Sequence, residues 1–275
     1  MRRMTREDLD MAVDWAAGEG WNPGLADAEC FYSAGPEGFL IAESQGKPLG
    51  SISAVAYDEQ FGFIGLFIVR PEVRGRRVGV ALGRAALAFL GDRNIGLDGV
   101  EAKVGSYEAL GFKLAHRNVR YEGRQRPCAA PGGVVELSSV PFAEVVRYDR
   151  LFFPAPRRDF LSRWINPQHG RALGVLKQGR LAGYGVLRAC RKGSKIGPLF
   201  ADDPAVAESL FQALVCPLAH DSPFYLDAPE TNPGAAALAQ KYGMLPVFRT
   251  ARMYSQAAPA LPGDRIFGVT SFELG

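Results

Sequence analysis

Histidine and cysteine are scarce in this sequence of 275 residues. The three histidines lie far apart and show no metal-ligand spacing, so the sequence predicts no metal site. The four cysteines form no Cys-x-x-Cys pair, and we expect all of them to be free, partly buried thiols. These residues are His116, His169, His220, Cys30, Cys128, Cys190 and Cys216.

Long hydrophobic runs are missing as well. No apolar stretch is long enough to span a membrane, and the N-terminal sequence MRRMTREDLD lacks the apolar core of a signal peptide. The formal net charge of +3 is too small to indicate a nucleic-acid partner. With 47% hydrophobic and 22% charged residues, the composition is that of a soluble globular protein. We therefore expect a cytoplasmic protein with neither a membrane nor a nucleic-acid partner.

Two familiar phosphate-binding motifs are also absent, Gly-x-x-x-x-Gly-Lys-Ser/Thr and Gly-x-Gly-x-x-Gly after a first strand. The chain does contain a basic, glycine-containing turn, RGRRVG at residues 74–79. It lies between an apolar run at residues 64–69 and helical spacing at residues 78–89. Because the first turn of a helix leaves N–H groups without partners, such a turn indicates an anion site. A solvated surface turn is the alternative.

The turn at residues 74–79 resembles the acyl-CoA-binding signature of the GNAT acetyltransferases, Arg/Gln-x-x-Gly-x-Gly/Ala between a strand and a helix. Arg74 and Gly79 match this signature, whereas Arg77 stands where its first glycine belongs. A second stretch, YEALGF at residues 107–112, resembles the GNAT ending Tyr-x-x-x-Gly-Phe. Together the two matches imply an α/β (α+β) fold with a site for acyl-CoA.

Part of the sequence recurs at an offset of 132 to 133 residues, which indicates a second copy of the same fold. The turn QGK at residues 45–47 recurs as QGR at residues 178–180, and Gly111 recurs as Gly243. The signature itself does not recur, because Gly79 falls on Gln212. We therefore expect the second copy to bind no acyl-CoA and to have a structural or acceptor-binding role.

This layout resembles a group of bacterial tandem GNAT proteins over nearly the whole chain, including the final residues FGVTSFELG. The resemblance implies two tandem GNAT-like domains, each a mixed, mostly antiparallel central sheet flanked by helices. The predicted boundaries are an N-terminal acyl-CoA-binding domain at 1–122, a linker at 123–135 and a degenerate C-terminal domain at 136–275.

Local patterns predict several elements within these domains. Thr5 followed by Asp8 predicts the start of a helix that ends at Gly18. Residues 39–43 and 49–57 read as strands joined by a turn, and a second hairpin turns near residues 58–61. Residues 100–110 are predicted to be helical. The Arg-, Pro- and Gly-rich stretch at residues 121–133 is predicted to be linker.

The resemblance also implies roles for individual residues. The backbone near residues 67–69 would hold the pantetheine and the acyl carbonyl, and amides of residues 75–80 would hold the pyrophosphate. Tyr107 would protonate the departing thiolate, with a packed helical aromatic as the alternative. The implied cofactor-binding set is Phe67, Ile68, Val69, Arg74, Gly75, Arg76, Arg77, Val78, Gly79 and Val80.

The acceptor side and the general base are less determined by the sequence. Trp21 and Asn22 lie where GNAT proteins place an acceptor-side loop, and Tyr57 ends a strand nearby, so these three are the substrate-binding candidates. The apolar run at residues 64–69 carries no carboxylate, which leaves Asp58 and Glu59 as the nearest candidate bases. Solvated acids in a hairpin, or a water chain as base, are the alternatives.

The resulting functional prediction is an acetyl-CoA-dependent N-acetyltransferase without a metal, acting on a small primary amine or amino-acid-like acceptor. The amine would attack the thioester directly in a ternary complex. The alternatives are a non-catalytic acyl-CoA sensor or structural protein and a protein N-acetyltransferase. The sequence does not determine the acceptor, the acyl-chain preference or the oligomeric state, and a homodimer is compatible with it.

Overall fold

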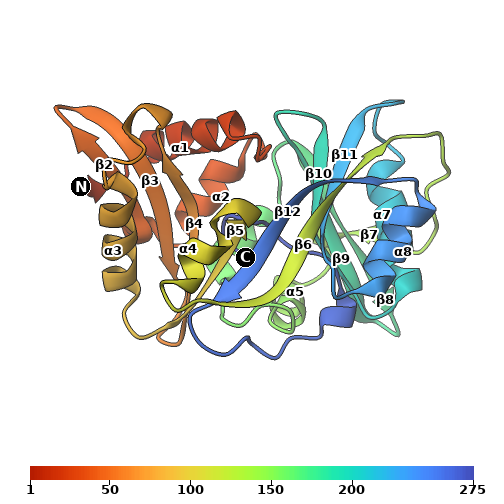
Figure 1. Cartoon of the computed structure of the whole chain (residues 1–275). Helices are drawn as coiled ribbons and strands as arrows, with labels where there is room; N and C mark the ends of the chain where they lie inside the picture. Colours follow the sequence, from red (N-terminus) through yellow and green to blue (C-terminus); the bar gives the residue numbers. More distant parts are fainter.

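The fold is described by a computed structural model that covers all 275 residues. Its strands form one 13-stranded mixed sheet, and α-helices lie on both halves of it (Figure 1). The strands are β1 (Arg2–Arg3), β2 (Phe39–Ser44), β3 (Lys47–Ala56), β4 (Phe61–Val69), β5 (Asn94–Val100), β6 (Lys113–Arg124), β7 (Val134–Glu136), β8 (Gly170–Lys177), β9 (Arg180–Ala189), β10 (Ser194–Ala201), β11 (Pro223–Pro229), β12 (Leu245–Tyr254) and β13 (Ile266–Gly268).

The helices begin where the local sequence supplies a cap. Thr5 and Asp8 form a capping box at the start of the first helix, while Asp203 and Asn232 cap two later ones. The helices are α1 (Arg6–Gly18), α2 (Asp27–Ser33), α3 (Val78–Leu90), α4 (Val104–Glu108), α5 (Phe142–Asp149), α6 (Arg158–Trp164), α7 (Pro204–Val215) and α8 (Pro233–Lys241). Short 3-10 turns are η1 (Pro36–Gly38), η2 (Pro71–Val73), η3 (Glu101–Lys103), η4 (Leu137–Ser139) and η5 (Gly263–Arg265).

The two halves of the chain repeat one order of elements. The order β2, β3, β4, α3, β5, α4 and β6 recurs as β8, β9, β10, α7, β11, α8 and β12. In each half the third strand of the series runs parallel to the strand that follows the helix, and the other neighbouring pairs are antiparallel. The predicted second copy of the fold is therefore confirmed.

The last strands of the two copies are exchanged at the centre of the sheet. The order there is β5, β12, β6 and β11, so that β12 of the second copy lies against β5 of the first copy. In turn, β6 of the first copy lies against β11 of the second copy. Figure 1 shows β6 and β12 passing side by side between the two halves. Each half of the sheet is thus completed by the other half's strand.

The C-terminal segment fills the gap between strands in the second copy. β10 and β11 pair at Ser194, Lys195 and Ile196 and then separate. β13 enters this gap, pairs with β10 and is followed by an N–H···O bond from Val269 to the carbonyl of Asp227 at 2.8 Å. Because the gap is occupied by the chain itself, the second copy has no open cleft at this position.

Two sequence predictions differ from the structure. Residues 100–110 were expected to be helical, yet β5 runs to Val100 and only η3 and the short α4 follow. The first residues of the predicted linker belong to β6, which extends to Arg124 because β11 pairs with it from Asn118 to Arg124. The exact domain boundaries stay a prediction, since the two halves share one sheet.

The expectation of four free thiols is wrong for one pair. Cys128 and Cys216 form a disulfide, with 5.5 Å between their Cα atoms and 88 residues between them in sequence. Cys30 and Cys190 are free, as expected. The pairing has no local signal, because the fold alone brings the stretch after β6 to the end of α7.

A buried histidine makes the stability of the protein sensitive to pH. His116 on β6 is half-buried opposite Arg252 on β12. Burial, followed by the charge of Arg252, lowers the pKa of His116 to about 4. The unfolded chain, with an ordinary histidine pKa of about 6.5, binds the proton first. The stabilisation is therefore complete above about pH 6.5 and is lost as the pH falls towards 4.

We expect urea unfolding to show this loss. Between about pH 7.5 and about pH 5 the free energy of unfolding should fall by about 2 kcal/mol through His116, and this part should be missing in His116→Gln. An equal pH dependence in both proteins would contradict the assignment.

Candidate active site

A cleft opens in the first half of the sheet where two parallel strands diverge. β4 and β5 are paired from Phe61 with Asn94 to Ile64 with Leu97, and no pairing follows. The end of β5 turns to β12 instead. Backbone groups of β4 beyond Ile64 therefore lack a strand partner on the side that faces β5. These groups are available to a ligand that extends along β4.

The backbone of β4 is also irregular at this point. The register with β3 shifts by one residue between Ser51 and Ser53, and Leu66 has a positive φ of 45°. The Ser51 hydroxyl donates a hydrogen bond of 2.8 Å to the Leu66 carbonyl and so holds the bulge. A bulge of this kind redirects backbone groups out of the sheet, and bulges are common next to active sites.

The N-terminus of α3 faces the same cleft and has no side-chain cap. Its N-cap residue is Arg77, whose φ of 63° lies in the left-handed region that favours glycine. This backbone geometry explains why a glycine stands here in the signature. The uncapped first-turn amides and the positive end of the helix dipole together form an anion-binding position.

The arginines of the turn have different surroundings. Arg74 donates from Nε to the Val69 carbonyl at 2.9 Å and forms an ion pair with Glu19, so it ties the end of β4 to the end of α1. Arg77 lines the cleft, whereas Arg76 does not. The Arg74 guanidinium is therefore engaged in holding the turn against β4 and α1.

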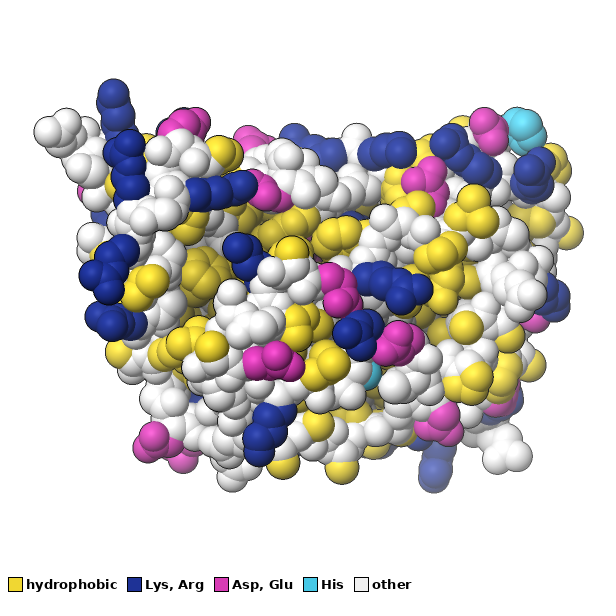
Figure 2. Space-filling view, in the orientation of Figure 1, with side chains coloured by type: hydrophobic (Ala, Val, Ile, Leu, Met, Phe, Trp, Pro, Cys, Tyr) yellow, Lys and Arg dark blue, Asp and Glu magenta, His cyan; other side chains and the backbone are white.

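The cleft is a cavity of about 620 Å³, lined by predicted cofactor-binding residues and by Trp21 of the predicted acceptor side. Figure 2 shows hydrophobic side chains inside a hollow on this face, between α3 and α4. Nine of the ten predicted cofactor-binding residues line it, the exception being Arg76. The lining residues from the first half that form its walls include Trp21, Gly65, Leu66, Phe67, Ile68, Val69, Arg74, Gly75, Arg77, Val78, Gly79, Val80, Asp98, Tyr107 and Leu110.

Tyr107 lies on α4 at the wall of the cavity opposite β4. Its ring packs on β5 beside Gly99, where a Cβ would lie 2.7 Å from the ring, and makes an edge contact with Phe112. Burial raises the pKa of Tyr107, so the phenol carries its proton at neutral pH. A protonated phenol at this place can donate to a leaving group.

The acceptor-side candidates from the sequence are only partly brought together. Trp21 lines the cavity, and its carbonyl accepts a hydrogen bond of 2.6 Å from Arg120. Asn22 instead bonds through its side chain to the backbone of Lys192 in the second half. Tyr57 is turned away from the cavity and donates from its hydroxyl to the Leu274 carbonyl at 2.8 Å.

Asp58 and Glu59 do not line the cavity. The Asp58 carboxylate accepts hydrogen bonds from the amides of Gln60 and Phe61, which is the turn chemistry of a β-hairpin. Asp58 thus has the alternative role, that of an acid in a hairpin turn. Neither acid lies in the cavity with Tyr107.

Other side chains that line the cavity come from parts of the chain that sequence patterns did not indicate. The second half contributes Phe248 and Thr250 from β12 and Phe272 and Glu273 from the final segment. Asp98 of β5 also lines the cavity and is bound by Arg252 at 2.6 Å. The resemblance of the final residues to tandem GNAT proteins includes Phe272 and Glu273 but implies no role for either residue.

No group of His, Cys, Asp or Glu residues in the structure could hold a metal ion. None of its helices is long and apolar enough to cross a membrane.

Comparison with known families agrees with this geometry. Residues 6–112 match the acetyltransferase (GNAT) family model, and residues 145–268 match a second acetyltransferase (GNAT) domain model. The two matches cover both copies of the repeated order of elements. The chain belongs to the GNAT acetyltransferase family.

Relatives of this tandem GNAT acyltransferase share its full length. A holothin acyltransferase from Pseudoalteromonas sp. (strain SANK 73390) is 29% identical over 271 residues, which cover 98% of this chain and 92% of the relative. A putative acetyltransferase from Pyrococcus horikoshii is 26% identical with a TM-score of 0.85, covering 100% of this chain and 95% of that chain. A tandem GNAT protein of the clavulanic acid biosynthesis pathway shares the fold at 17% identity and a TM-score of 0.64, covering 94% and 98%.

The left-handed backbone conformation of Arg77 can be tested by substitution. Since Arg77 is the N-cap of α3 with φ 63°, Arg77→Gly should raise the free energy of unfolding by about 0.5–1 kcal/mol. Its affinity for acetyl-CoA should stay close to that of the wild type, because the backbone amide is retained.

Arg76→Gly is the matched control, since Arg76 has no positive φ, and it should not stabilise the protein. Urea unfolding and calorimetric titration check both variants. A loss of acetyl-CoA affinity in Arg77→Gly alone would show that the Arg77 side chain itself binds the ligand.

Proposed function

We propose that the protein is an acetyl-CoA-dependent N-acyltransferase for a small primary amine, with direct transfer in a ternary complex. The observation that carries this proposal is the cavity that joins the unpaired edge of β4, the uncapped N-terminus of α3 and Tyr107. Each of these three features corresponds to one part of an acyl-CoA thioester: its pantetheine, its pyrophosphate and its sulfur.

The cofactor side of the proposal rests on backbone groups. The pyrophosphate would accept hydrogen bonds from first-turn amides of α3, near Val78 and Gly79. The pantetheine amides would pair with the free edge of β4, much as an added strand would. The acyl carbonyl would lie at the bulge near Leu66, where redirected backbone N–H groups can polarise it.

The leaving group would be protonated by Tyr107. When the C–S bond breaks, the sulfur becomes a thiolate that needs a proton, and the buried phenol holds one at neutral pH. The attacking amine would approach from the opposite side, where the lining comes from Trp21, Phe248 and Phe272.

A small acceptor is favoured by the shape of that side. β12 and the final segment of the second half form part of the cavity wall, which leaves the amine a chamber within the protein. Its aromatic lining suits a flat, compact amine. The relative that acts on holothin matches over nearly the whole of both chains, so holothin is the first acceptor to test.

Titration of acetyl-CoA by calorimetry tests the cofactor side. A Cβ on Gly79 would make ordinary contacts, 3.4 Å from Val69 and 3.6 Å from Phe67, so the fold should tolerate substitution here. Gly79→Glu places a carboxylate at the anion position and should reduce the affinity by at least about 100-fold, while Gly79→Ala stays folded and binds more strongly than Gly79→Glu. Equal affinity of wild type and Gly79→Glu would place the pyrophosphate elsewhere.

Release of CoA tests the transfer. With acetyl-CoA and a panel of primary amines that includes holothin, at least one amine should accelerate release. Tyr107→Phe should lower kcat by about 100-fold with little change in acetyl-CoA affinity, because only the proton donor is removed. If no amine accelerates release while acetyl-CoA binds, the protein is an acyl-CoA-binding sensor.

A further inference from the structure

The final segment, residues 264–275, crosses from the second copy to the first. Its β13 fills the gap between β10 and β11, and its end reaches the cleft of the first copy, where Phe272 and Glu273 line the cavity. A Cβ on Gly65 of β4 would overlap the carbonyl oxygen of Glu273, so the two backbones are in direct contact. Glu273 therefore lies beside the part of β4 that is proposed to hold the acyl group.

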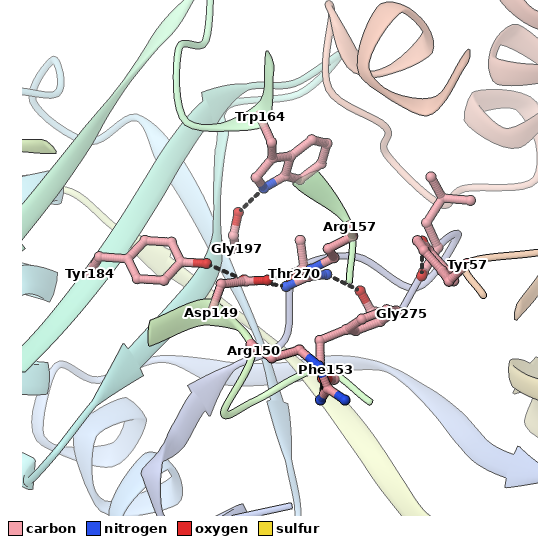
Figure 3. Close-up of polar contacts among 11 residues, drawn as sticks. Tyr57, Asp149, Arg150, Phe153, Arg157, Trp164, Tyr184, Gly197, Thr270 and Gly275 are labelled. Carbon is pink, nitrogen blue, oxygen red and sulfur yellow. Dashed lines mark hydrogen bonds and ion pairs between the residues drawn. The ribbon is translucent and has the colours of Figure 1, made fainter. Parts of the chain in front are cut away.

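The segment is fixed on both sides of Glu273. Arg157 donates to the Thr270 hydroxyl at 2.9 Å and to the Gly275 carbonyl at 3.2 Å (Figure 3). The same guanidinium makes two hydrogen bonds, of 2.7 and 2.8 Å, with Asp149. Asp149 thus holds the guanidinium in place, and the guanidinium binds the segment at Thr270 and Gly275.

Further bonds fix the residues next to Glu273. Tyr57 binds the Leu274 carbonyl, and the Leu274 amide donates to the Ser271 hydroxyl at 3.1 Å. Asp149 is itself oriented by the Tyr184 hydroxyl at 2.5 Å, as Figure 3 shows. The position of Glu273 is thus set by both halves of the protein.

Three carboxylates line the cavity, and two of them are engaged. Glu19 forms the ion pair with Arg74 at the rim. Asp98 accepts hydrogen bonds from Arg252 and, at 2.8 Å, from Asn118, and its side chain is fully buried. Glu273 is 3% exposed and lines the cavity, and its carboxylate forms no ion pair or hydrogen bond with the protein. It is the carboxylate that remains free to accept a proton.

Several cationic side chains lie near Glu273. Arg120 of β6, Arg188 of β9 and Lys195 of β10 all act on it electrostatically. Arg120 is paired with Asp227 of β11 at 2.6 Å, and Arg188 is paired with Asp27 of α2. Lys195 donates to the Trp21 carbonyl at 3.5 Å, and burial lowers the pKa of its ammonium group. From the first half, Asp98, Tyr107 and Glu19 are the titratable groups that share the cavity, with the exposed Lys103 and the guanidinium groups of Arg74 and Arg77.

We propose that Glu273 is the general base that takes the proton from the attacking amine. The inference rests on the proposed acyl transfer and names a base from outside β4, which carries no carboxylate of its own. The N-terminal copy would thus provide the acyl-CoA site and Tyr107, while the end of the C-terminal copy provides the base.

The proton balance of the step is complete. The Glu273 carboxylate accepts one proton from the substrate ammonium and later releases it to solvent. The neutral amine forms the C–N bond, and the C–S bond breaks with the electron pair on sulfur. Tyr107 gives its proton to the thiolate and regains one from the amine nitrogen, through solvent, as the amide forms. The net products are the amide, CoA and one proton.

The experiment measures CoA release from acetyl-CoA against pH, with water alone and with holothin as acceptors. Water carries no titrating amine, so the acid limb of that profile reports a group of the protein. Glu273→Gln should lower both rates by about 100-fold and remove the acid limb of the hydrolysis profile. Acetyl-CoA affinity, measured by calorimetry, should change by less than about three-fold.

Two further variants separate catalysis from structure. Glu273→Ala should regain at least about ten-fold in rate with added formate, which a purely structural role would not produce. Glu37→Gln, at an exposed carboxylate in η1, should match the wild type in every readout. If the neutral variants fail to fold, Glu273→Asp keeps the charge but withdraws the carboxylate, and an unchanged rate in it would overturn the proposal.

The outcomes distinguish the two proposals. A wild-type rate with an intact acid limb in Glu273→Gln, or no rescue by formate, would overturn the role of Glu273 and leave the acyl transfer standing. If the wild type releases no CoA with water or with any amine, the proposed transfer fails and the base fails with it.

Discussion

The exchange of the last strands, β6 against β12, is the constraint on which the rest of the structure depends. On one side, β5 pairs with β4 over only four residues. On its other side, β12 pairs with β5 from Gly96 to Val100. Without β12 the edge of β5 would carry unpaired backbone groups beside the cleft. The second copy is therefore needed by the first copy even though its own cleft is filled, and Phe248 and Thr250 reach the cavity as a consequence.

The final segment follows from the same arrangement. A chain that leaves β12 near the centre of the sheet can fill the gap between β10 and β11 and still reach β4 within twenty residues. In the gap it pairs with β10 through its backbone, and at β4 it meets Gly65 without a side chain in the way. One segment thus closes the gap in the second copy and forms part of the cavity wall in the first.

Sequence patterns predict the parts of this protein that depend on neighbouring residues. The caps at Thr5, Asp203 and Asn232 and the turn before α3 are local, because each needs only a few residues in a row. β5 was missed because its sequence, NIGLDGV, contains two glycines that weaken a strand pattern. Glu273, Phe248 and the Cys128–Cys216 disulfide could not be found in this way, since each depends on contacts between residues far apart in sequence.

α3 and α7 occupy equivalent places in the two copies, but their first turns differ. In α7 the Asp203 carboxylate accepts from the Val206 amide at 3.0 Å, so the helix satisfies its own first turn. α3 has no such cap, and its N-cap residue is Arg77 in the left-handed region, although capping normally stabilises a helix by about 1 kcal/mol. A side-chain cap and a bound anion would compete for the same amides. The fold forms with either arrangement, so nothing in the fold requires the uncapped turn of α3, whose free amides are the ones proposed to bind the pyrophosphate.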